Sequence, residues 1–296
     1  MIDLNNYKNK IEFDIIGITK AEKLIYLEDF LIERLNSSKT CEFESKDLQK
    51  RIDPKANLFN AKSVITCAIN YYYPYKYLEH EKYLISMSSF GLDYHKVLRE
   101  KLESFVAILK RDYDFNYLIQ IDSGPLIERE YSLKSGIGFI GKNCNLITKL
   151  GSFVFIGLII LDRDVKLDYE KFKGDCKDCN ICIKACPTKA LSPYRCDASK
   201  CLSYLTQKKG ELLASEQKLF KNFVYGCDIC QRVCPMNKNI KPNEHPEFQP
   251  MITSLNREEI QNMSNREFKR QYQKHAFSWR GKGIILRNMD YIDKNR

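Results

Sequence analysis

The strongest constraint on this chain is a run of four cysteines within eleven residues, spaced C-x2-C-x2-C-x3-C and followed by proline. With this spacing three neighbouring thiolates can hold one 4Fe-4S cluster, while the fourth cysteine, redirected by the proline, ligates a second cluster. The pattern therefore predicts an iron–sulfur module of bacterial type. Its cysteines are Cys176, Cys179, Cys182 and Cys186.

A second cysteine run repeats the first without its opening member. Eight thiolates complete two 4Fe-4S clusters, so one ligand has to come from outside both runs. Cys196 and Cys201 both precede the second run, and local spacing does not choose between them. The expected sets are Cys176, Cys179, Cys182 and Cys234 for one cluster, and Cys186, Cys227, Cys230 and one further cysteine for the other.

Zinc also binds C-x2-C pairs, but it explains neither the three-cysteine run nor the repeated Cys-Pro. A simple two-cluster electron carrier is a second alternative. That class needs few residues besides its ligands, whereas 175 residues precede Cys176 here. We therefore expect an upstream domain that receives the electrons. Cys41, Cys67 and Cys144 lie outside both runs and are expected to be small buried thiols.

Composition favours a cytoplasmic protein that contacts a polyanion. The amino terminus lacks a signal-peptide pattern, and the longest apolar run, FVFIGLIIL, is about half a membrane span. Twelve cysteines in such a chain are expected to be thiols or metal ligands rather than disulfides. The net charge of +10 favours a polyanion such as nucleic acid, although an unspecific solvated charge is the alternative.

Periodicity predicts an α+β fold. Apolar residues at three-and-four spacing predict helices over residues 20–37 and 95–113, and β-branched and aromatic runs predict strands over 63–73 and 117–122. Two further strands are expected on either side of residues 149–152. We divide the chain into an α+β domain over 1–168, a ferredoxin-like domain over 169–240 and a basic helical segment over 241–296.

The densest stretch without ligand cysteines is IDSGPLIEREYSLKSGIGFIGKNCNLI. Asp122 ends a predicted strand, a turn follows, and Glu128 opens a predicted helix. An acid at a strand end beside a glycine-rich segment suits a cofactor pocket, but Asp122 could equally be a turn or capping residue.

The chain resembles the epoxyqueuosine reductase family, which completes queuosine at the wobble position of tRNA with cobalamin and iron–sulfur clusters. The resemblance spans roughly residues 15 to 290. It is carried by RIDPKANLFNAKSVITCAINY, DYHKVLREKL, DSGPLIERE, SGIGFIGKNCNLI, the first cysteine run, CLSYLT, YGCDICQRVCPMN and FSWRGKGIILRN. It implies a mixed-sheet cobalamin-binding domain before the ferredoxin module.

The resemblance also implies residue roles. Cys201 would be the eighth cluster ligand, and Asp122 would donate a proton as cob(I)alamin opens the epoxide, provided that burial keeps its carboxyl group protonated. Arg129 would orient substrate or cofactor. The corrin would be bordered by Gly138, Gly141, Lys142 and Asn143, and separated from a cluster by Ser203, Tyr204 and Asp228, unless these three are ordinary capping and packing residues.

The sequence departs from the family pattern in two places. Met87, Ser88 and Ser89 replace an Arg-Tyr-Ala segment, and the chain stops where many members continue into a helical-repeat domain for tRNA. Leu98 stands where a cobalt-ligating motif has glycine, so His95 is not expected to bind cobalt.

The expected partners are a tRNA anticodon stem-loop and a low-potential donor such as flavodoxin or ferredoxin. The alternative within corrinoid chemistry is a reductive dehalogenase. Candidate phosphate contacts are Lys208, Lys209, Arg266, Lys269, Arg270, Arg280, Lys282 and Arg287.

Overall fold

A four-stranded antiparallel sheet forms the centre of the amino-terminal half. A computed structural model describes residues 1–37, 39–77 and 81–296. The strands lie in the order β2 (Ile15–Lys20), β3 (Ser63–Asn70), β8 (Val154–Leu161) and β5 (Tyr117–Ile121). All eight residues of β3 are buried, as expected of a central strand covered on both faces.

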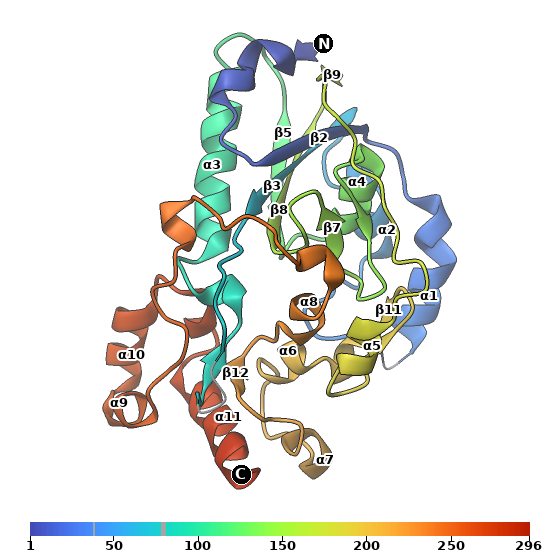
Figure 1. The fold of residues 1–296 in the computed structure, drawn as a ribbon. Helices are drawn as coiled ribbons and strands as arrows, with labels where there is room; N and C mark the ends of the chain where they lie inside the picture. Colours follow the sequence, from blue (N-terminus) through green and yellow to red (C-terminus); the bar gives the residue numbers. More distant parts are fainter. Residues whose placement is uncertain (38, 78–80) are drawn as a thin grey trace.

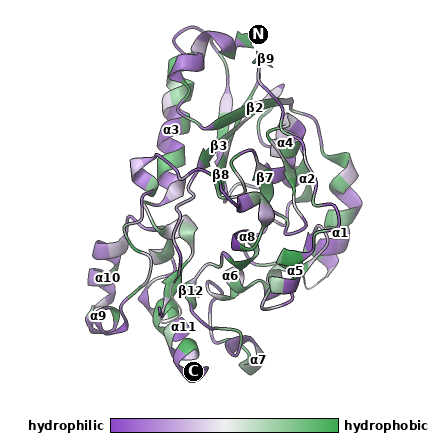
Figure 2. Cartoon of the chain, viewed as in Figure 1, coloured by the Kyte–Doolittle hydropathy of each residue, from purple (hydrophilic) through white to green (hydrophobic). Residues whose placement is uncertain are grey.

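Helices cover both faces of this sheet. On one face lies α3 (Tyr94–Leu109), whose Asp93 accepts the backbone N–H of His95 as N-cap. On the other face lie α1 (Glu28–Asn36), α2 (Leu48–Ile52) and α4 (Glu128–Ser135) (Figure 1). Successive residues of β8 point to opposite faces of the sheet. Ile159 packs in the core that contains α3, and Ile160 packs in the core that contains α1, α2 and α4. Figure 2 shows the hydrophobic strands enclosed by these helices.

Short elements complete the chain. The paired strands are β1 (Ile2–Asp3) with β9 (Val165–Lys166), β4 (Leu84–Ile85) with β12 (Phe223–Tyr225), β6 (Gly138–Ile140) with β7 (Leu146–Thr148), and β10 (Leu191–Ser192) with β11 (Arg195–Cys196). The 3-10 turns are η1 (Leu4–Lys10), η2 (Ile25–Leu27), η3 (Pro54–Ala56), η4 (Met87–Ser89), η5 (Ala198–Lys200), η6 (Pro235–Asn237), η7 (Pro246–Phe248) and η8 (Ala276–Ser278).

The cysteine-rich region packs below the sheet in the view of Figure 1. It contains α5 (Ile181–Ala185), α6 (Leu202–Leu205), α7 (Ala214–Gln217) and α8 (Ile229–Arg232). Strand β12 of this region pairs in parallel with β4 of the preceding part of the chain. That pairing ties the cysteine-rich region to the α+β part through backbone hydrogen bonds.

The last segment folds back onto the rest of the molecule. It contains α9 (Arg257–Asn262), α10 (Asn265–Tyr272) and α11 (Lys282–Lys294). Phe277 and Met289 belong to the same hydrophobic core as α3. The fully buried Asn288 side chain donates to the carbonyl oxygens of Thr206 and Val224, at 2.7 and 2.8 Å. This segment is therefore part of the main core.

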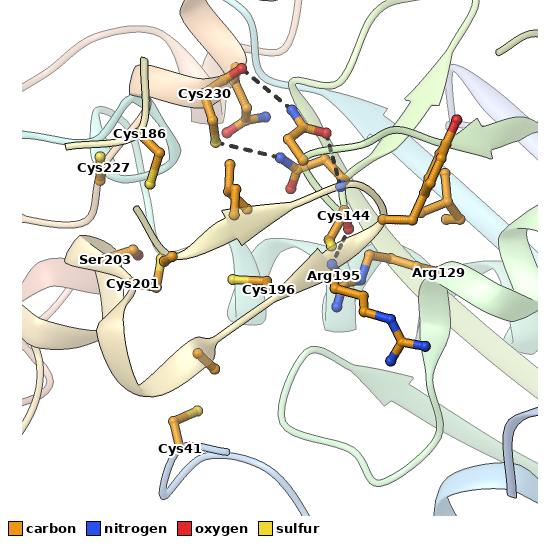
Figure 3. A pocket seen from close by; sticks show the side chains of 18 of the residues that line it. Cys41, Arg129, Cys144, Cys186, Arg195, Cys196, Cys201, Ser203, Cys227 and Cys230 are labelled. Carbon is orange, nitrogen blue, oxygen red and sulfur yellow. Dashed lines mark hydrogen bonds between the residues drawn. The ribbon is translucent and has the colours of Figure 1, made fainter. Parts of the chain in front are cut away.

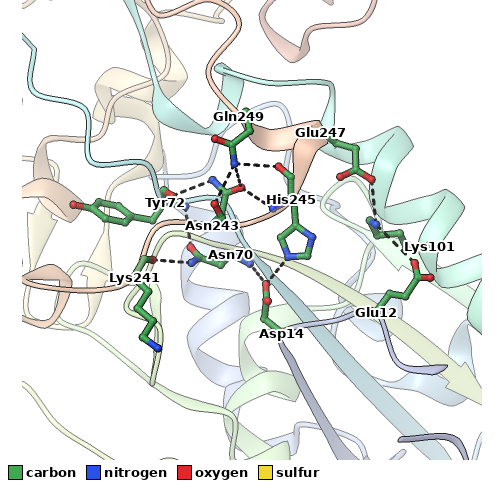
Figure 4. Close-up of polar contacts among 10 residues, drawn as sticks. All are labelled: Glu12, Asp14, Asn70, Tyr72, Lys101, Lys241, Asn243, His245, Glu247 and Gln249. Atoms are coloured by element: carbon green, nitrogen blue, oxygen red, sulfur yellow. Dashed lines mark hydrogen bonds and ion pairs between the residues drawn. The ribbon is translucent and has the colours of Figure 1, made fainter. Parts of the chain in front are cut away.

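A polar network fastens residues 241–249 across the edge of the sheet (Figure 4). Asp14 lies 2.9 Å from the ring of His245 and accepts the backbone N–H of Asn70 at 2.7 Å. Burial would raise the pKa of Asp14, but these contacts outweigh it and the pKa lies below its ordinary value.

Several sequence predictions are confirmed, and others are corrected. All six apolar positions expected on the second helix are buried in α3. The predicted helix over 20–37 begins only at Glu28 as an α-helix, after the 3-10 turn η2. The sheet is antiparallel throughout rather than mixed. The two strands expected on either side of residues 149–152 are β7, which pairs with β6, and β8, which lies in the sheet. Among the described residues, no helix has the length and apolar character needed to cross a bilayer.

Candidate active site

A cavity of about 530 Å³ lies between the α+β part and the cysteine-rich region (Figure 3). Arg129 and Asn143 border it from the α+β side, and apolar side chains such as Ile127 and Ile140 complete that wall. From the other side it is bordered by Cys186, Cys201, Cys227 and Cys230. A large cavity lined by apolar groups and a few convergent polar groups is the usual form of a cofactor site.

The cysteines expected for the second cluster therefore share one cavity. Burial, together with the charges of neighbouring groups that include Cys201 and Cys186, raises the pKa of the Cys230 thiol to about 12. Cys196 lies beside Cys201 and also lines the cavity, but Cys201 is the one whose charge acts on both Cys227 and Cys230.

The cysteines expected for the first cluster gather elsewhere. Burial raises the pKa of the Cys182 thiol, and Cys234, Cys176 and Cys179 lie close enough to raise it further. The backbone N–H of Lys142 donates to the Cys176 sulfur at 3.3 Å. None of these four cysteines borders the cavity in the described part of the chain.

Arg129, predicted to orient substrate or cofactor, and the residues predicted to border the corrin differ in where they lie. Arg129 and Asn143 do line the cavity; Arg129 donates to the Cys144 carbonyl, and Asn143 donates to the Cys230 carbonyl at 3.4 Å. Lys142 points instead to the first cysteine set, donating to the Lys177 carbonyl at 2.6 Å and to Asn180 at 3.2 Å.

Gly138 and Gly141 shape the β6–β7 hairpin rather than the cavity wall. A Cβ at Gly138 would lie 2.5 Å from the Ile147 carbonyl oxygen, and one at Gly141 would lie 2.7 Å from the Ile147 side chain. The backbone contact restricts Gly138 to glycine, whereas the contacts at Gly141 are with the ends of side chains.

The three residues beside cluster ligands also differ from one another. Ser203 lines the cavity. Asp228 also reaches it, but its side chain is committed to structure: it is 2% exposed and accepts the Met87 N–H at 2.6 Å and the Tyr77 hydroxyl at 3.0 Å. Tyr204 packs edge-on against Phe43, with ring centroids 5.3 Å apart, and is not among the cavity-lining residues.

Asp122 lies at the end of β5, where two side chains of α3 meet it. The Tyr94 hydroxyl donates to Asp122 Oδ2 at 2.8 Å, and His95 Nε2 lies 3.1 Å from the same oxygen. His95 Nδ1 lies 2.8 Å from Asp93 Oδ1, so the imidazole bridges two carboxyl groups. The carboxylate of Asp122 remains accessible, with 61% of its side chain exposed.

The loop after Asp122 is braced by side-chain hydrogen bonds. Asp122 has a φ of +49°, in the left-handed region that aspartate tolerates better than most residues. The Gln120 side chain braces the loop by bonding both the N–H and the carbonyl of Leu126, at 3.1 and 2.9 Å. A Cβ at Gly124 would collide with Gln120, which explains the glycine in DSGP.

The charge state of Asp122 follows from its neighbours. Burial would raise its pKa, but the hydrogen bonds from His95 and Tyr94 and the charges of His95 and Arg129 outweigh burial, so the pKa lies below its ordinary value. Asp122 is therefore ionised at neutral pH in this arrangement, whereas a proton donor has to carry a proton.

Two neighbours of Asp122 hold protons instead. Burial lowers the pKa of His95, but the hydrogen bonds and charges of Asp122 and Asp93 raise it to about 9. Burial, followed by the charge of Asp122, raises the pKa of Glu128 to about 8. Glu128 Oε1 is buried and has no hydrogen-bond partner among the described residues. At neutral pH the site thus contains an imidazolium and a neutral carboxyl group beside an ionised aspartate.

Sequence reasoning assigned no role to Tyr94 or Glu128 and gave His95 no catalytic part. Tyr94 and His95 open a helix, and their side chains meet Asp122 only because β5 and α3 are adjacent in the fold. The nearest signal in the sequence is the DYH triplet itself.

The candidate phosphate contacts are not equivalent. Arg287 is committed to carbonyl oxygens of residues 205–210, Lys282 to those of Gln261 and Met263, and Lys208 to Glu216. These three side chains hold loops in place. Lys209, Arg266, Lys269 and Arg270 are exposed.

Comparison with known proteins identifies the family. Residues 51–123 match the family model described as "Epoxyqueuosine reductase QueG, DUF1730", and residues 175–237 match a 4Fe-4S double cluster binding domain. The epoxyqueuosine reductase of Lactococcus garvieae is 40% identical over 93% of this chain and 81% of its own length. The chain belongs to the epoxyqueuosine reductase family. The reductase of Cellulophaga algicola is 35% identical over 96% of this chain and 94% of its own length.

Solved structures of epoxyqueuosine reductases share the fold described here. One, in complex with a tRNA-Tyr epoxyqueuosine-modified stem loop, has a TM-score of 0.91 at 35% identity and covers 99% of this chain and 80% of that chain. The Streptococcus thermophilus enzyme has a TM-score of 0.89 at 34% identity with the same coverage. A catabolic reductive dehalogenase has a TM-score of 0.50 at 15% identity over 78% of this chain and 31% of that chain, so it shares the fold alone. The chain is thus an oxidoreductase of the queuosine pathway with a 4Fe-4S binding domain.

Proposed function

We propose that this epoxyqueuosine reductase deoxygenates epoxyqueuosine at the wobble position of tRNA with cobalamin in the 530 Å³ cavity and two 4Fe-4S clusters as the electron relay. The observation that carries the proposal is that all four ligands assigned to the second cluster line the cavity. Electrons stored on that cluster would then reach a cofactor in the same cavity without crossing the protein interior.

The residues present fit both kinds of cofactor. Eight thiols in two groups suit iron, a metal for which soft thiolate ligands are typical. The groups are Cys176, Cys179, Cys182 and Cys234, and Cys186, Cys201, Cys227 and Cys230. The cavity lies within the range of roughly 300–1,000 Å³ that is typical of cofactor sites, and Arg129, Asn143 and Ser203 would border cobalamin in it. When bound, cobalamin in its Co(I) state supplies the nucleophile that opens the epoxide.

The protein's part in the reaction is to deliver protons. Reduction of the epoxide to the alkene consumes two electrons and two protons and releases one water molecule. The exposed Asp122 carboxyl group would pass a proton to the epoxide oxygen. Because Asp122 is ionised at rest, its proton would come from His95, whose Nε2 lies 3.1 Å away. Glu128 would hold the second proton.

The loop that carries Asp122 resembles a feature of a relative. A Bacillus subtilis epoxyqueuosine reductase, 35% identical with a TM-score of 0.90, has been solved with the loop of its catalytic aspartate swung out of the active site. We assign the same catalytic role to Asp122. A loop that swings would let Asp122 exchange protons with His95 in one position and reach the substrate in another.

The partners follow from the substrate and from the charge. The stem loop bound by a relative supports an anticodon stem-loop as the partner here, and the exposed Lys209, Arg266, Lys269 and Arg270 are available for its phosphates. The clusters would be reduced by a low-potential donor such as flavodoxin or ferredoxin.

Anaerobic purification followed by reconstitution tests this proposal. Protein supplied with iron, sulfide and cobalamin should contain about eight iron atoms and one cobalt atom per chain and should convert epoxyqueuosine in tRNA to queuosine. Protein that binds zinc in place of iron, or that converts the substrate equally well without cobalamin, would contradict it.

A further inference from the structure

Two exposed rings from distant segments, with an arginine packed against both, form a surface beside the cavity. Trp279, the only tryptophan of the chain, is 53% exposed, and Phe43 is 43% exposed. Their ring centroids lie 5.6 Å apart. The guanidinium of Arg280 lies 4.0 Å from the Trp279 ring centroid and 5.1 Å from that of Phe43. We call Phe43, Trp279 and Arg280 the aromatic platform.

The platform is held rigidly although it is not buried. Trp279 Nε1 donates to Gln207 Oε1 at 3.0 Å, and Arg280 is paired with Glu42. The Arg280 side chain is only 11% exposed, and its Nε has no hydrogen-bond partner in the part of the chain that the structure describes. Neighbouring exposed apolar side chains form a candidate interaction surface.

The platform borders the proposed catalytic site. Cys41, two residues before Phe43, lines the cavity, as does Ser203, next to Tyr204, whose ring contacts Phe43. On the other side, Trp279 reaches Tyr225, and the charge of Asp122 acts on Tyr225. A group resting on Trp279 or Phe43 would therefore lie next to a substrate held between the cavity and Asp122.

We propose that the platform stacks an unpaired nucleobase of the tRNA anticodon loop that neighbours the modified nucleotide. This proposal rests on the function proposed above. Single-stranded bases are recognised by stacking on aromatic rings, and Trp279 and Phe43 expose two such rings, which Arg280 supports from within. The platform is also near positive charge: Lys208 lies close enough to act on Tyr204, and Lys209 is exposed.

Binding of an epoxyqueuosine stem-loop to the cofactor-loaded enzyme tests the proposal. Trp279→Ala should weaken binding about tenfold to a hundredfold, and Trp279→Phe should restore most of it because a ring is present again. The dependence of affinity on salt should keep its slope, since no phosphate contact is lost. Phe59→Ala is the matched control: Phe59 is 82% exposed and lies away from the cavity, so binding should not change.

Fluorescence of the single tryptophan gives a second measurement on the unaltered chain. The stem-loop should quench it, and a stem-loop with abasic sites on both sides of the modified nucleotide should not. Iron content and circular dichroism show whether each variant is folded.

Unchanged affinity of Trp279→Ala, together with unchanged fluorescence, would overturn the platform. Slower cluster reduction by a flavodoxin with normal RNA affinity would assign the surface to the electron donor and would also overturn it. If the unaltered enzyme still converts the stem-loop in either case, the proposed function stands. If it neither binds nor converts the stem-loop, both proposals fail.

Discussion

Replacing Asp93 with asparagine should move the pH dependence of epoxide reduction without disturbing the fold. Asp93 caps α3 and also contacts His95 Nδ1 at 2.8 Å. Asparagine caps helices about as well as aspartate, so the change removes one charge and keeps the cap. The two carboxyl groups of Asp93 and Asp122 together raise the pKa of His95 from 6.5 to about 9.

The size of the effect follows from that contact. Removing one of two carboxylates should lower the pKa of His95 by roughly one pH unit, or about 1.4 kcal/mol. Solvent screening limits the effect, because 37% of the His95 side chain is exposed. If His95 recharges Asp122, turnover falls as His95 loses its proton. The alkaline limb of the rate profile should then begin about one pH unit lower than in the unaltered enzyme, with little change near pH 6.

The assay is anaerobic turnover of epoxyqueuosine-containing tRNA between about pH 6 and 9.5, with nucleoside mass analysis. Asp47→Asn is the matched control, because Asp47 caps α2 in the same way and is exposed. It should leave the profile unchanged. A profile of Asp93→Asn that coincides with that of the unaltered enzyme would refute the proton relay through His95.

Three further predictions concern other parts of the site. Cys201→Ser should lose about half of the iron, or convert one cluster to a degraded form, whereas Cys196→Ser should keep the iron; the reverse result, read by iron analysis and paramagnetic resonance, would show that the eighth ligand is Cys196. Replacing Lys269 and Arg270 by glutamine should weaken tRNA binding and flatten its salt dependence, and an unchanged slope would place the phosphate contacts elsewhere. A carboxyl group whose pKa is raised in the folded protein contributes stability at low pH and loses that contribution as the pH rises. Thermal stability should therefore fall between about pH 5 and 8, and Glu128→Gln should remove that fall. An identical pH dependence of unfolding in the variant would mean that Glu128 is not held neutral.

Local sequence patterns predicted the features that depend on the spacing of neighbouring residues. Helix α3 was predicted because its apolar residues recur at helical spacing, and all six are buried. The 4Fe-4S binding domain was predicted because thiolate spacing reflects the chemistry of iron directly. Both features depend on residues that are close together in the sequence.

Contacts between distant segments could not be predicted in this way. His95 and Asp122 meet because of how α3 packs on the sheet, and this contact helps to keep the pKa of Asp122 below its ordinary value. Arg287 and Lys282 carry the positive charge expected of phosphate contacts, yet in the folded chain both side chains donate to backbone carbonyl oxygens. Composition records a charge but not what the folded chain places beside it.

The most direct test of the proposed mechanism is a single turnover by Asp122→Asn. Asparagine tolerates the φ of +49° at this position and keeps much of the hydrogen bonding, but it has no acidic proton to deliver. The variant should fold and bind cobalamin and both clusters. It should convert epoxyqueuosine in tRNA about two to four orders of magnitude more slowly than the unaltered enzyme, which is the usual contribution of a general acid. Near-normal conversion with intact cofactors would contradict the account and would remove Asp122 from the mechanism.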